Sequence, residues 1–218
     1  MVAVSIAHIC LLSGQSRLVA SGVGDFNVAA FRALAPIPCT NMDAITHHLV
    51  WTRLGGLGHL AVQYANKLGY TVVAISRGSD KKEHALELGA AHYIDSKAED
   101  VGKVLQSLGG AKIVLSTAPS SQAAGACIDG LSRNGKLVVV GATMDQIPVT
   151  PLQLIGKRRT IIGWPSGTAR DSQDAMEFAH AHKIVSKTVV FEGIDKAPEA
   201  YAAMRQGVYR VVLKVADE

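Results

Sequence analysis

The sequence predicts an α/β fold with a doubly wound parallel sheet. Short apolar or β-branched runs alternate with helical stretches from residue 48 onward, as in a series of strand–helix–strand units. The composition agrees with this prediction, because 48% of the 218 residues are hydrophobic and only 5% are aromatic. A chain of this length can bury a full core, and right-handed crossovers would place helices on both faces of the sheet.

The expected strands and helices follow one another at regular spacing. Short β-branched or apolar runs predict strands over 48–52, 71–75, 92–94, 112–116, 136–140 and 160–163. Helical spacing of apolar residues predicts helices in a segment closed by Gly69, over 80–88, over 99–108 and in a segment ending at Leu131. The tail predicts a helix over 171–182, a strand over 188–191, a helix over 196–205 and a strand over 209–215. The first 40 residues keep neither period and predict no regular element.

Charge and cysteine content exclude several classes of protein. The formal net charge is +4 and the pI about 9.0, but the basic residues are scattered apart from residues 157–159, so we expect no nucleic-acid surface. The apolar run over 2–12 is too short to cross a membrane and lacks a basic segment before it. Three widely spaced cysteines, Cys10, Cys39 and Cys127, argue against a disulfide framework and a four-cysteine zinc site. We therefore expect a cytoplasmic protein with no membrane partner.

A glycine cluster after the first strand points to a ligand. Residues 55–58 read Gly-Gly-Leu-Gly between a strand and a helix, and a second strand follows about 20 residues on. Gly55 lets the backbone approach a pyrophosphate, Gly58 lets the helix pack on the strand, and the helix N-terminus attracts anions. This context predicts a Rossmann-type dinucleotide-binding domain; the alternative is a tight turn without a ligand. Arg53 stands where the first glycine of G-x-G-x-x-G is usual, and either crowds the loop or adds a cation.

The end of the second strand favours NADP over NAD. An acidic residue here would bond the ribose 2′-hydroxyl and repel a 2′-phosphate, but the chain has Ser76, Arg77 and then Lys81. A hydroxyl, a guanidinium and an ammonium suit a phosphate group. The alternative interpretation is a solvated basic loop before a helix.

Several longer stretches carry a family resemblance. They are GGLGHLAVQYANKLG at 55–69, AISRG at 74–78, KLVVVGA at 136–142, PLQLIGKRRTIIGWPSGT at 151–168 and EAYAAMRQG at 199–207. From about residue 55 to 213 the chain resembles the zinc-dependent alcohol dehydrogenases of the medium-chain dehydrogenase/reductase superfamily, especially microbial, fungal and cinnamyl-alcohol-type members. The resemblance implies reversible hydride transfer between an alcohol and an aldehyde or ketone, with a nicotinamide cofactor carrying the hydride.

The resemblance also implies cofactor contacts. Gly55, Gly56, Leu57 and Gly58 match the pyrophosphate loop, and Ser76, Arg77 and Lys81 match the 2′-phosphate contacts of NADP-dependent members. The remaining implied contacts come from the carboxyl ends of later strands and from the tail: Ser116, Thr117, Val140, Gly141, Ala142 and Arg210. Family members assemble through an edge strand, here 160–163, so we expect a homodimer.

The same resemblance divides the chain and raises the question of zinc. It implies a poorly defined segment over 1–45 as a remnant of a β-rich catalytic domain, an NADP-binding domain over 46–168, and a C-terminal segment over 169–218 that packs on the catalytic domain. We expect most of that catalytic domain to be missing. Cys39 resembles the last cysteine ligand of the catalytic zinc, but a catalytic zinc needs three protein ligands. Because His47 and His48 point to opposite sides of a strand, we expect no complete metal site and assign no catalytic residue.

Three functional hypotheses remain open at this stage. The first is an NADP-dependent alcohol dehydrogenase by descent, and the second a truncated NADP-binding module without catalysis, which the missing zinc-ligand segments favour. The third is a zinc-free quinone or enoyl reductase of the same superfamily. The lack of zinc ligands favours it, but the stretch at 55–69 resembles the alcohol dehydrogenases more closely. A methyltransferase is the weakest alternative, because Ser76 and Arg77 replace the acid that would hold a ribose.

Overall fold

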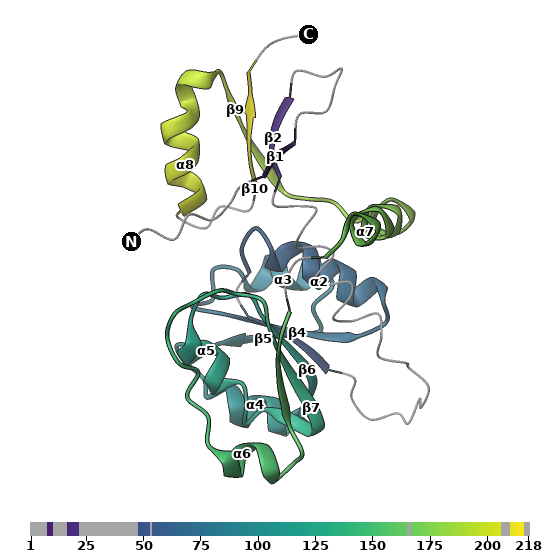
Figure 1. Cartoon of the computed structure of the whole chain (residues 1–218), viewed down its shortest axis with the longest axis vertical. Helices are drawn as coiled ribbons and strands as arrows, with labels where there is room; N and C mark the ends of the chain where they lie inside the picture. Colours follow the sequence, from purple (N-terminus) through teal and green to yellow (C-terminus); the bar gives the residue numbers. More distant parts are fainter. Residues whose placement is uncertain are drawn as a thin grey trace.

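The computed structural model describes residues 8–10, 17–21, 48–52, 54–164, 167–205 and 210–215. The chain forms two β-sheets with helices packed on them (Figure 1). The larger sheet lies in the lower part of the view, and the smaller one lies above it with one helix along its side. Within the described residues, no helix is both long and apolar enough to cross a membrane.

The larger sheet has six strands, all parallel, in the order β5-β4-β3-β6-β7-β8. The strands are β3 (His48–Thr52), β4 (Thr71–Ser76), β5 (His92–Asp95), β6 (Ala111–Ser116), β7 (Leu131–Val139) and β8 (Thr160–Gly163). Numbered along the chain, this is the 3-2-1-4-5-6 order of a dinucleotide-binding sheet. The predicted doubly wound parallel sheet is therefore confirmed.

Helices cover both faces of this sheet. They are α2 (Gly58–Lys67), α3 (Lys82–Glu87), α4 (Val101–Ser107) and α5 (Ser121–Ala126). In Figure 1, α2 and α3 lie above the sheet and α4 and α5 below it. The side chains of β4 and β6 alternate between the two cores: Val72 and Leu115 pack on the α2 side, whereas Val73 and Val114 pack on the α4 side. Burial on both faces explains why these strands read as continuous apolar runs.

The smaller sheet joins the two ends of the chain. Its strands are β1 (His8–Cys10), β2 (Arg17–Ser21), β9 (Thr188–Glu192) and β10 (Arg210–Lys214), in the order β1-β2-β10-β9. A 3₁₀ turn, η1 (Ile194–Lys196), leads into α8 (Ala197–Arg205), which contacts β10. The helix α7 (Ala169–Ala181) connects the two sheets and packs on α2, where Tyr64 donates a hydrogen bond of 2.9 Å to the carbonyl oxygen of Ala175.

The structure differs from the sequence expectation in four respects. Strands β1 and β2 form within the first 40 residues, where no period was sustained; β1 pairs with β2, and β2 pairs with the distant β10. The helix expected to end at Leu131 ends at Ala126 instead, and β7 begins at Leu131 rather than at residue 136. The register of β7 against β6 shifts between Ala111 and Ile113, whose partners are Leu131 and Lys136. The residues of β7 before Lys136 therefore form an irregular part of the strand.

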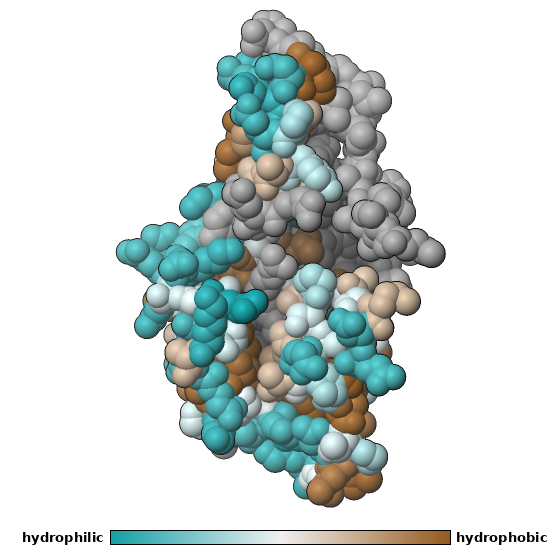
Figure 2. Space-filling model, turned by 90° about the vertical axis from the view of Figure 1, so that its left-hand side faces the viewer, coloured by the Kyte–Doolittle hydropathy of each residue, from teal (hydrophilic) through white to brown (hydrophobic). Residues whose placement is uncertain are grey.

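The fourth difference is α6 (Pro151–Ile155), which the sequence analysis did not predict. The Thr150 side chain caps it, and the Gln153 side chain accepts a hydrogen bond from the backbone N–H of Thr150, in a capping box with a proline at the first helical position. Its apolar side chains face outward: Leu152 and Ile155 are 77% and 73% exposed. Figure 2 shows the resulting apolar surface at the lower end of the molecule.

Candidate functional site

The candidate site lies at the carboxyl ends of the parallel strands. Strands β3 and β6 are neighbours in the sheet although two strand–helix units separate them in sequence, so the chain direction across the sheet reverses between them. In open α/β sheets, ligands bind outside the carboxyl ends of the strands at this point. Residues of four strand ends, β3, β4, β6 and β7, are thereby gathered at one edge.

The glycine loop between β3 and α2 leaves its backbone accessible. A Cβ atom added at Gly55 would meet no heavy atom within 4 Å, so the space beside this residue is open. Among the described residues, no side chain caps α2 at Leu57, and its first turn carries no acidic residue. An uncapped helix N-terminus beside an open backbone suits a pyrophosphate, which accepts hydrogen bonds from N–H groups and is drawn by the helix dipole.

A pocket of about 790 Å³ opens between the end of β4 and the start of α5. Its wall contains the three residues predicted to hold a 2′-phosphate, Ser76, Arg77 and Lys81. Ser76 is buried at the strand end, whereas Arg77 is exposed on the loop that follows. The structure therefore brings together a hydroxyl, a guanidinium and an ammonium, as the sequence pattern indicated.

Lys81 makes a contact that the sequence analysis did not anticipate. Its Nζ donates a hydrogen bond of 2.6 Å to the carbonyl oxygen of Leu54, directly before the glycine loop. The lysine therefore links the loop after β4 to the loop after β3. Its ammonium lies against the backbone directly before the predicted pyrophosphate loop.

The sequence analysis also missed a group of residues at the end of β5. Tyr93, Asp95 and Ser96 all form side-chain hydrogen bonds to the backbone of the loop after β4. Two N–H donors, from Lys97 and Gly78, lower the pKa of the Asp95 carboxyl. Burial raises the pKa of the Tyr93 hydroxyl. The only sequence signal was Gly78, whose φ of +81° requires a glycine-like turn.

The ends of β6 and β7 lie against one another. The backbone N–H groups of Val140 and Gly141 donate to the carbonyl oxygen of Ser116 at 3.0 and 2.9 Å. A Cβ atom at Gly141 would lie 2.6 Å from the carbonyl oxygen of Ala118, so only glycine fits there without a backbone shift. The structure thus places Ser116 and Thr117 next to Val140 and Gly141, and Ala142 follows on the exposed side.

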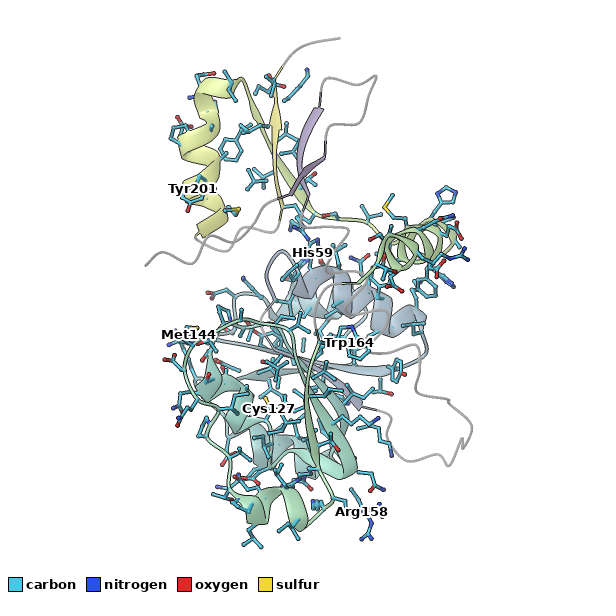
Figure 3. The ribbon with its side chains drawn as sticks, viewed as in Figure 1. His59, Cys127, Met144, Arg158, Trp164 and Tyr201 are labelled. Atoms are coloured by element: carbon cyan, nitrogen blue, oxygen red, sulfur yellow. The ribbon has the colours of Figure 1, made fainter. Side chains whose placement is uncertain are left out.

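His59 connects the glycine loop to the smaller sheet. Its Nδ1 lies 3.1 Å from the carbonyl oxygen of Gly55, and its Nε2 accepts a hydrogen bond of 3.1 Å from the backbone N–H of Lys187. The ring is therefore neutral, with its proton on Nδ1. Burial lowers the pKa of His59 from 6.5 to about 4, the bond to Gly55 opposes this shift, and the charge of Arg210 lowers the pKa further. In Figure 3, His59 lies on the side of α2 that faces the smaller sheet.

Arg210 lies close to the same histidine. It begins β10, its backbone N–H donates to the carbonyl oxygen of Lys187 at 3.1 Å, and burial lowers the pKa of its guanidinium. The predicted C-terminal phosphate contact and the predicted glycine loop are therefore connected through His59 and Lys187.

The structure adds little on metal binding. Cys39, the predicted zinc ligand, lies outside the described residues, as do His47 and Arg53. Among the residues that are described, no three His, Cys, Asp or Glu side chains lie close enough to hold a metal ion. Cys127, at the C-terminal end of α5, is buried in the core on the α4 side of the larger sheet, and burial raises its pKa to about 12, so its thiol stays protonated.

Comparison with known proteins shows the family of this chain. Residues 56–181 match the family model of the zinc-binding dehydrogenases. The chain belongs to that family. An alcohol dehydrogenase named patD from Penicillium expansum is 49% identical over 157 residues, which are 72% of this chain and 46% of that protein. An alcohol dehydrogenase from Geobacillus stearothermophilus is 35% identical over 166 residues, which are 74% of this chain and 49% of that protein.

Solved zinc-binding dehydrogenase structures share the fold. A cinnamyl alcohol dehydrogenase from Sorghum bicolor superposes with a TM-score of 0.75 at 25% identity, covering 88% of this chain and 54% of that one. An alcohol dehydrogenase zinc-binding domain protein from Burkholderia ambifaria gives a TM-score of 0.79 at 22% identity, covering 91% and 54%. The chain is thus an alcohol dehydrogenase-like oxidoreductase domain of a family that uses a nicotinamide cofactor. It spans about half the length of the curated relatives it matches.

Proposed function

We propose that this chain is the NADP(H)-binding portion of an alcohol dehydrogenase that transfers hydride between an alcohol and an aldehyde or ketone. The supporting observation is the pocket that holds Ser76, Arg77 and Lys81 together, beside the open glycine loop. The relatives named as alcohol dehydrogenases support an alcohol or aldehyde as the substrate class.

The charges around the pocket support NADP over NAD. Two acidic side chains also line it, but both form local hydrogen bonds. Asp100 caps α4 by accepting from the backbone N–H of Lys103 at 3.1 Å, and Glu99 accepts from the backbone N–H of Asp95 at 3.1 Å. Since Arg77 and Lys81 are the cations nearest the end of β4 in the pocket wall, a 2′-phosphate fits there better than a bare ribose.

Each part of the candidate site then has a separate task. The residues of the glycine loop, Gly55 to Gly58, and the N-terminus of α2 hold the pyrophosphate, and Arg210 adds a positive charge on the same side. Ser76, Arg77 and Lys81 hold the 2′-phosphate. Ser116, Thr117 and the segment from Val140 to Ala142 line the nicotinamide side. The bound cofactor supplies the hydride chemistry.

Zinc is implied by the family. Because the described residues offer no converging set of three ligands, no zinc-dependent step is assigned to them. A second candidate function is an NADP(H)-binding domain without catalysis of its own. A turnover assay with alcohols, run with and without added zinc, separates the two.

The proposal is tested by titrating the protein with NADPH and, separately, with NADH, following nicotinamide fluorescence. We expect saturable NADPH binding that Arg77→Asp weakens by at least about tenfold, equivalent to about 1.4 kcal/mol. Arg158→Asp is the matched control, because Arg158 is exposed at the opposite end of the larger sheet (Figure 3). Absence of binding to either cofactor would refute the proposal, and equal losses in both variants would refute the role of Arg77.

We further propose a homodimer formed through β8. This strand is the last of the larger sheet, Ile162 on it is 39% exposed, and α6, which precedes β8 along the chain, also exposes apolar side chains. An edge strand with apolar neighbours favours pairing with a second copy. Size-exclusion chromatography with light scattering should give twice the chain mass of 23.0 kDa, and Ile162→Lys should return the monomer mass. A wild-type monomer at micromolar concentration would contradict the proposed dimer.

The cysteine spacing supports a cytoplasmic location.

A further inference from the structure

The end of β5 holds the backbone on both sides of Arg77. On the N-terminal side, the carbonyl oxygen of Ser76 accepts hydrogen bonds from the backbone N–H and the Oγ of Ser96, at 2.9 and 3.2 Å. On the C-terminal side, the N–H of Gly78 donates to Oδ1 of Asp95 at 2.7 Å, and the carbonyl oxygen of Gly78 accepts from the Tyr93 hydroxyl at 2.5 Å. Four hydrogen bonds therefore fix the two residues that flank Arg77.

The bond from Gly78 to Asp95 is well suited to hold this turn. A carboxylate acceptor makes shorter and stronger hydrogen bonds than a neutral one, and 2.7 Å lies in that shorter range. Asp95 is itself fixed, because Oδ1 also accepts from the N–H of Lys97 at 2.9 Å. Gly78 has a φ of +81°, a conformation that glycine adopts without strain, so the turn needs external contacts to select it among the many that glycine permits.

We propose that Tyr93 and Asp95 are positioning residues that set the preference for a phosphorylated dinucleotide by fixing the backbone of Arg77. This inference rests on the proposed function. Neither residue needs to touch the cofactor: each acts on Gly78, and through it on where the guanidinium of Arg77 can reach. A guanidinium recognises a phosphate through a planar pair of N–H groups, so its placement matters more than that of a point charge.

The positioning role predicts a specific pattern. NADPH and NADH differ only in the 2′-phosphate, so a change that displaces Arg77 lowers affinity for NADPH and leaves affinity for NADH unchanged. A general loss of folding would lower both affinities together. The opposite hypothesis treats Asp95 as a bare negative charge beside the phosphate site; removing that charge would then raise affinity for NADPH.

The experiment measures dissociation constants of NADPH and NADH by calorimetry for the wild type, Tyr93→Phe, Asp95→Ala and Asp95→Asn. Tyr93→Phe removes only the hydroxyl, and Asp95→Asn keeps an oxygen acceptor for Gly78 without the charge. We expect Tyr93→Phe and Asp95→Ala to weaken NADPH binding about fivefold to tenfold, in line with the loss of one hydrogen bond. We expect NADH binding to stay within about twofold, and Asp95→Asn to restore most of the preference for NADPH.

A second set of variants tests whether the effect passes through Arg77. In an Arg77→Ala background, Tyr93→Phe and Asp95→Ala should cause no further loss of NADPH affinity, because residues that act through one another are not additive. If Arg77→Ala abolishes the preference for NADPH over NADH while the Tyr93 and Asp95 variants keep that preference, the inference is overturned and the proposed function stands. Equal losses for both cofactors, or tighter NADPH binding by Asp95→Asn than by the wild type, also overturn the inference. If the wild type binds neither cofactor, the proposed function fails first.

Discussion

The six-stranded and four-stranded sheets bury their strands to very different extents. In β4, every residue after Thr71 is buried, and both faces of the strand contact helices. In β9, Phe191 is partly buried and the other four residues are exposed. Both strands contain consecutive valines, at 72–73 in β4 and at 189–190 in β9. Paired valines are therefore buried in a core in the larger sheet and exposed on the surface in the smaller one.

This difference shows where the stability of the chain resides. The larger sheet has two complete cores of its own. The smaller sheet is attached to it through hydrogen bonds from α2: His59 binds the backbone of Lys187, and Gln63 forms two hydrogen bonds, of 2.9 and 3.1 Å, with the backbone of Val185. We therefore expect changes in the larger sheet to affect folding as a whole, and changes at this junction to depend on the protonation of His59.

The largest expected effect concerns the pH dependence of stability through His59. The native pKa is about 4 and the unfolded value 6.5, so between these pH values the unfolded chain binds the proton and the native chain does not. The stabilising contribution of neutral His59 is complete above pH 6.5 and is lost as the pH falls towards 4, by about 3 kcal/mol at pH 4. Urea denaturation of the wild type and His59→Gln at pH 7 and 4 should show this loss in the wild type alone.

The exposed His180 provides the control for that experiment. His180→Gln should keep the pH dependence of the wild type, because His180 is exposed on α7, whereas the hydrogen bond that joins α2 to the backbone of Lys187 is made by His59. Parallel pH dependence in the wild type and His59→Gln would show that His59 is not a buried neutral junction between the two sheets.

A smaller effect compares one substitution in both sheets. Val114→Ala removes two buried methyl groups from a side chain that is 0% exposed and should reduce the free energy of unfolding by about 2 kcal/mol. Val190→Ala makes the same change at a side chain that is 53% exposed and should cost less than about 1 kcal/mol. Urea midpoints measured at pH 7 give both values. Equal costs would mean that the smaller sheet is covered in solution, and the comparison between the sheets would no longer hold.

The larger sheet could be predicted from the sequence because its strands are buried on both faces. Such strands read as short apolar runs, and glycines with positive φ, such as Gly69 and Gly89, mark the returns from helix to strand. Strands β1 and β2 could not be predicted, since they carry no periodic pattern and β2 pairs with β10, almost 200 residues away. The helix α6 was missed although the capping box at Thr150 and Gln153 is visible in the sequence.

The candidate site shows the same division between local and long-range information. Gly55 to Gly58 and Ser76 to Lys81 were predicted because each lies in a short motif that follows a strand. Tyr93 and Asp95 were missed because they contact Gly78 only when β5 pairs with β4, which no local pattern reveals. The role of His59 was missed for the same reason, since its partner Lys187 lies 128 residues further along the chain. The assignment of these residues to NADP, and the domain boundaries at 45 and 168, stay predictions.

The hydrogen bond from Lys81 to the carbonyl oxygen of Leu54 has a consequence for how a ligand would be received. An ammonium has three N–H donors, so Lys81 could donate to a 2′-phosphate entering the pocket and keep its bond to the carbonyl oxygen of Leu54. That bond already orders part of the lysine side chain, which would lower the entropy cost of binding a phosphate. The same contact tethers the backbone before the glycine loop to the start of α3, so part of the ordering that a dinucleotide requires is built into the fold.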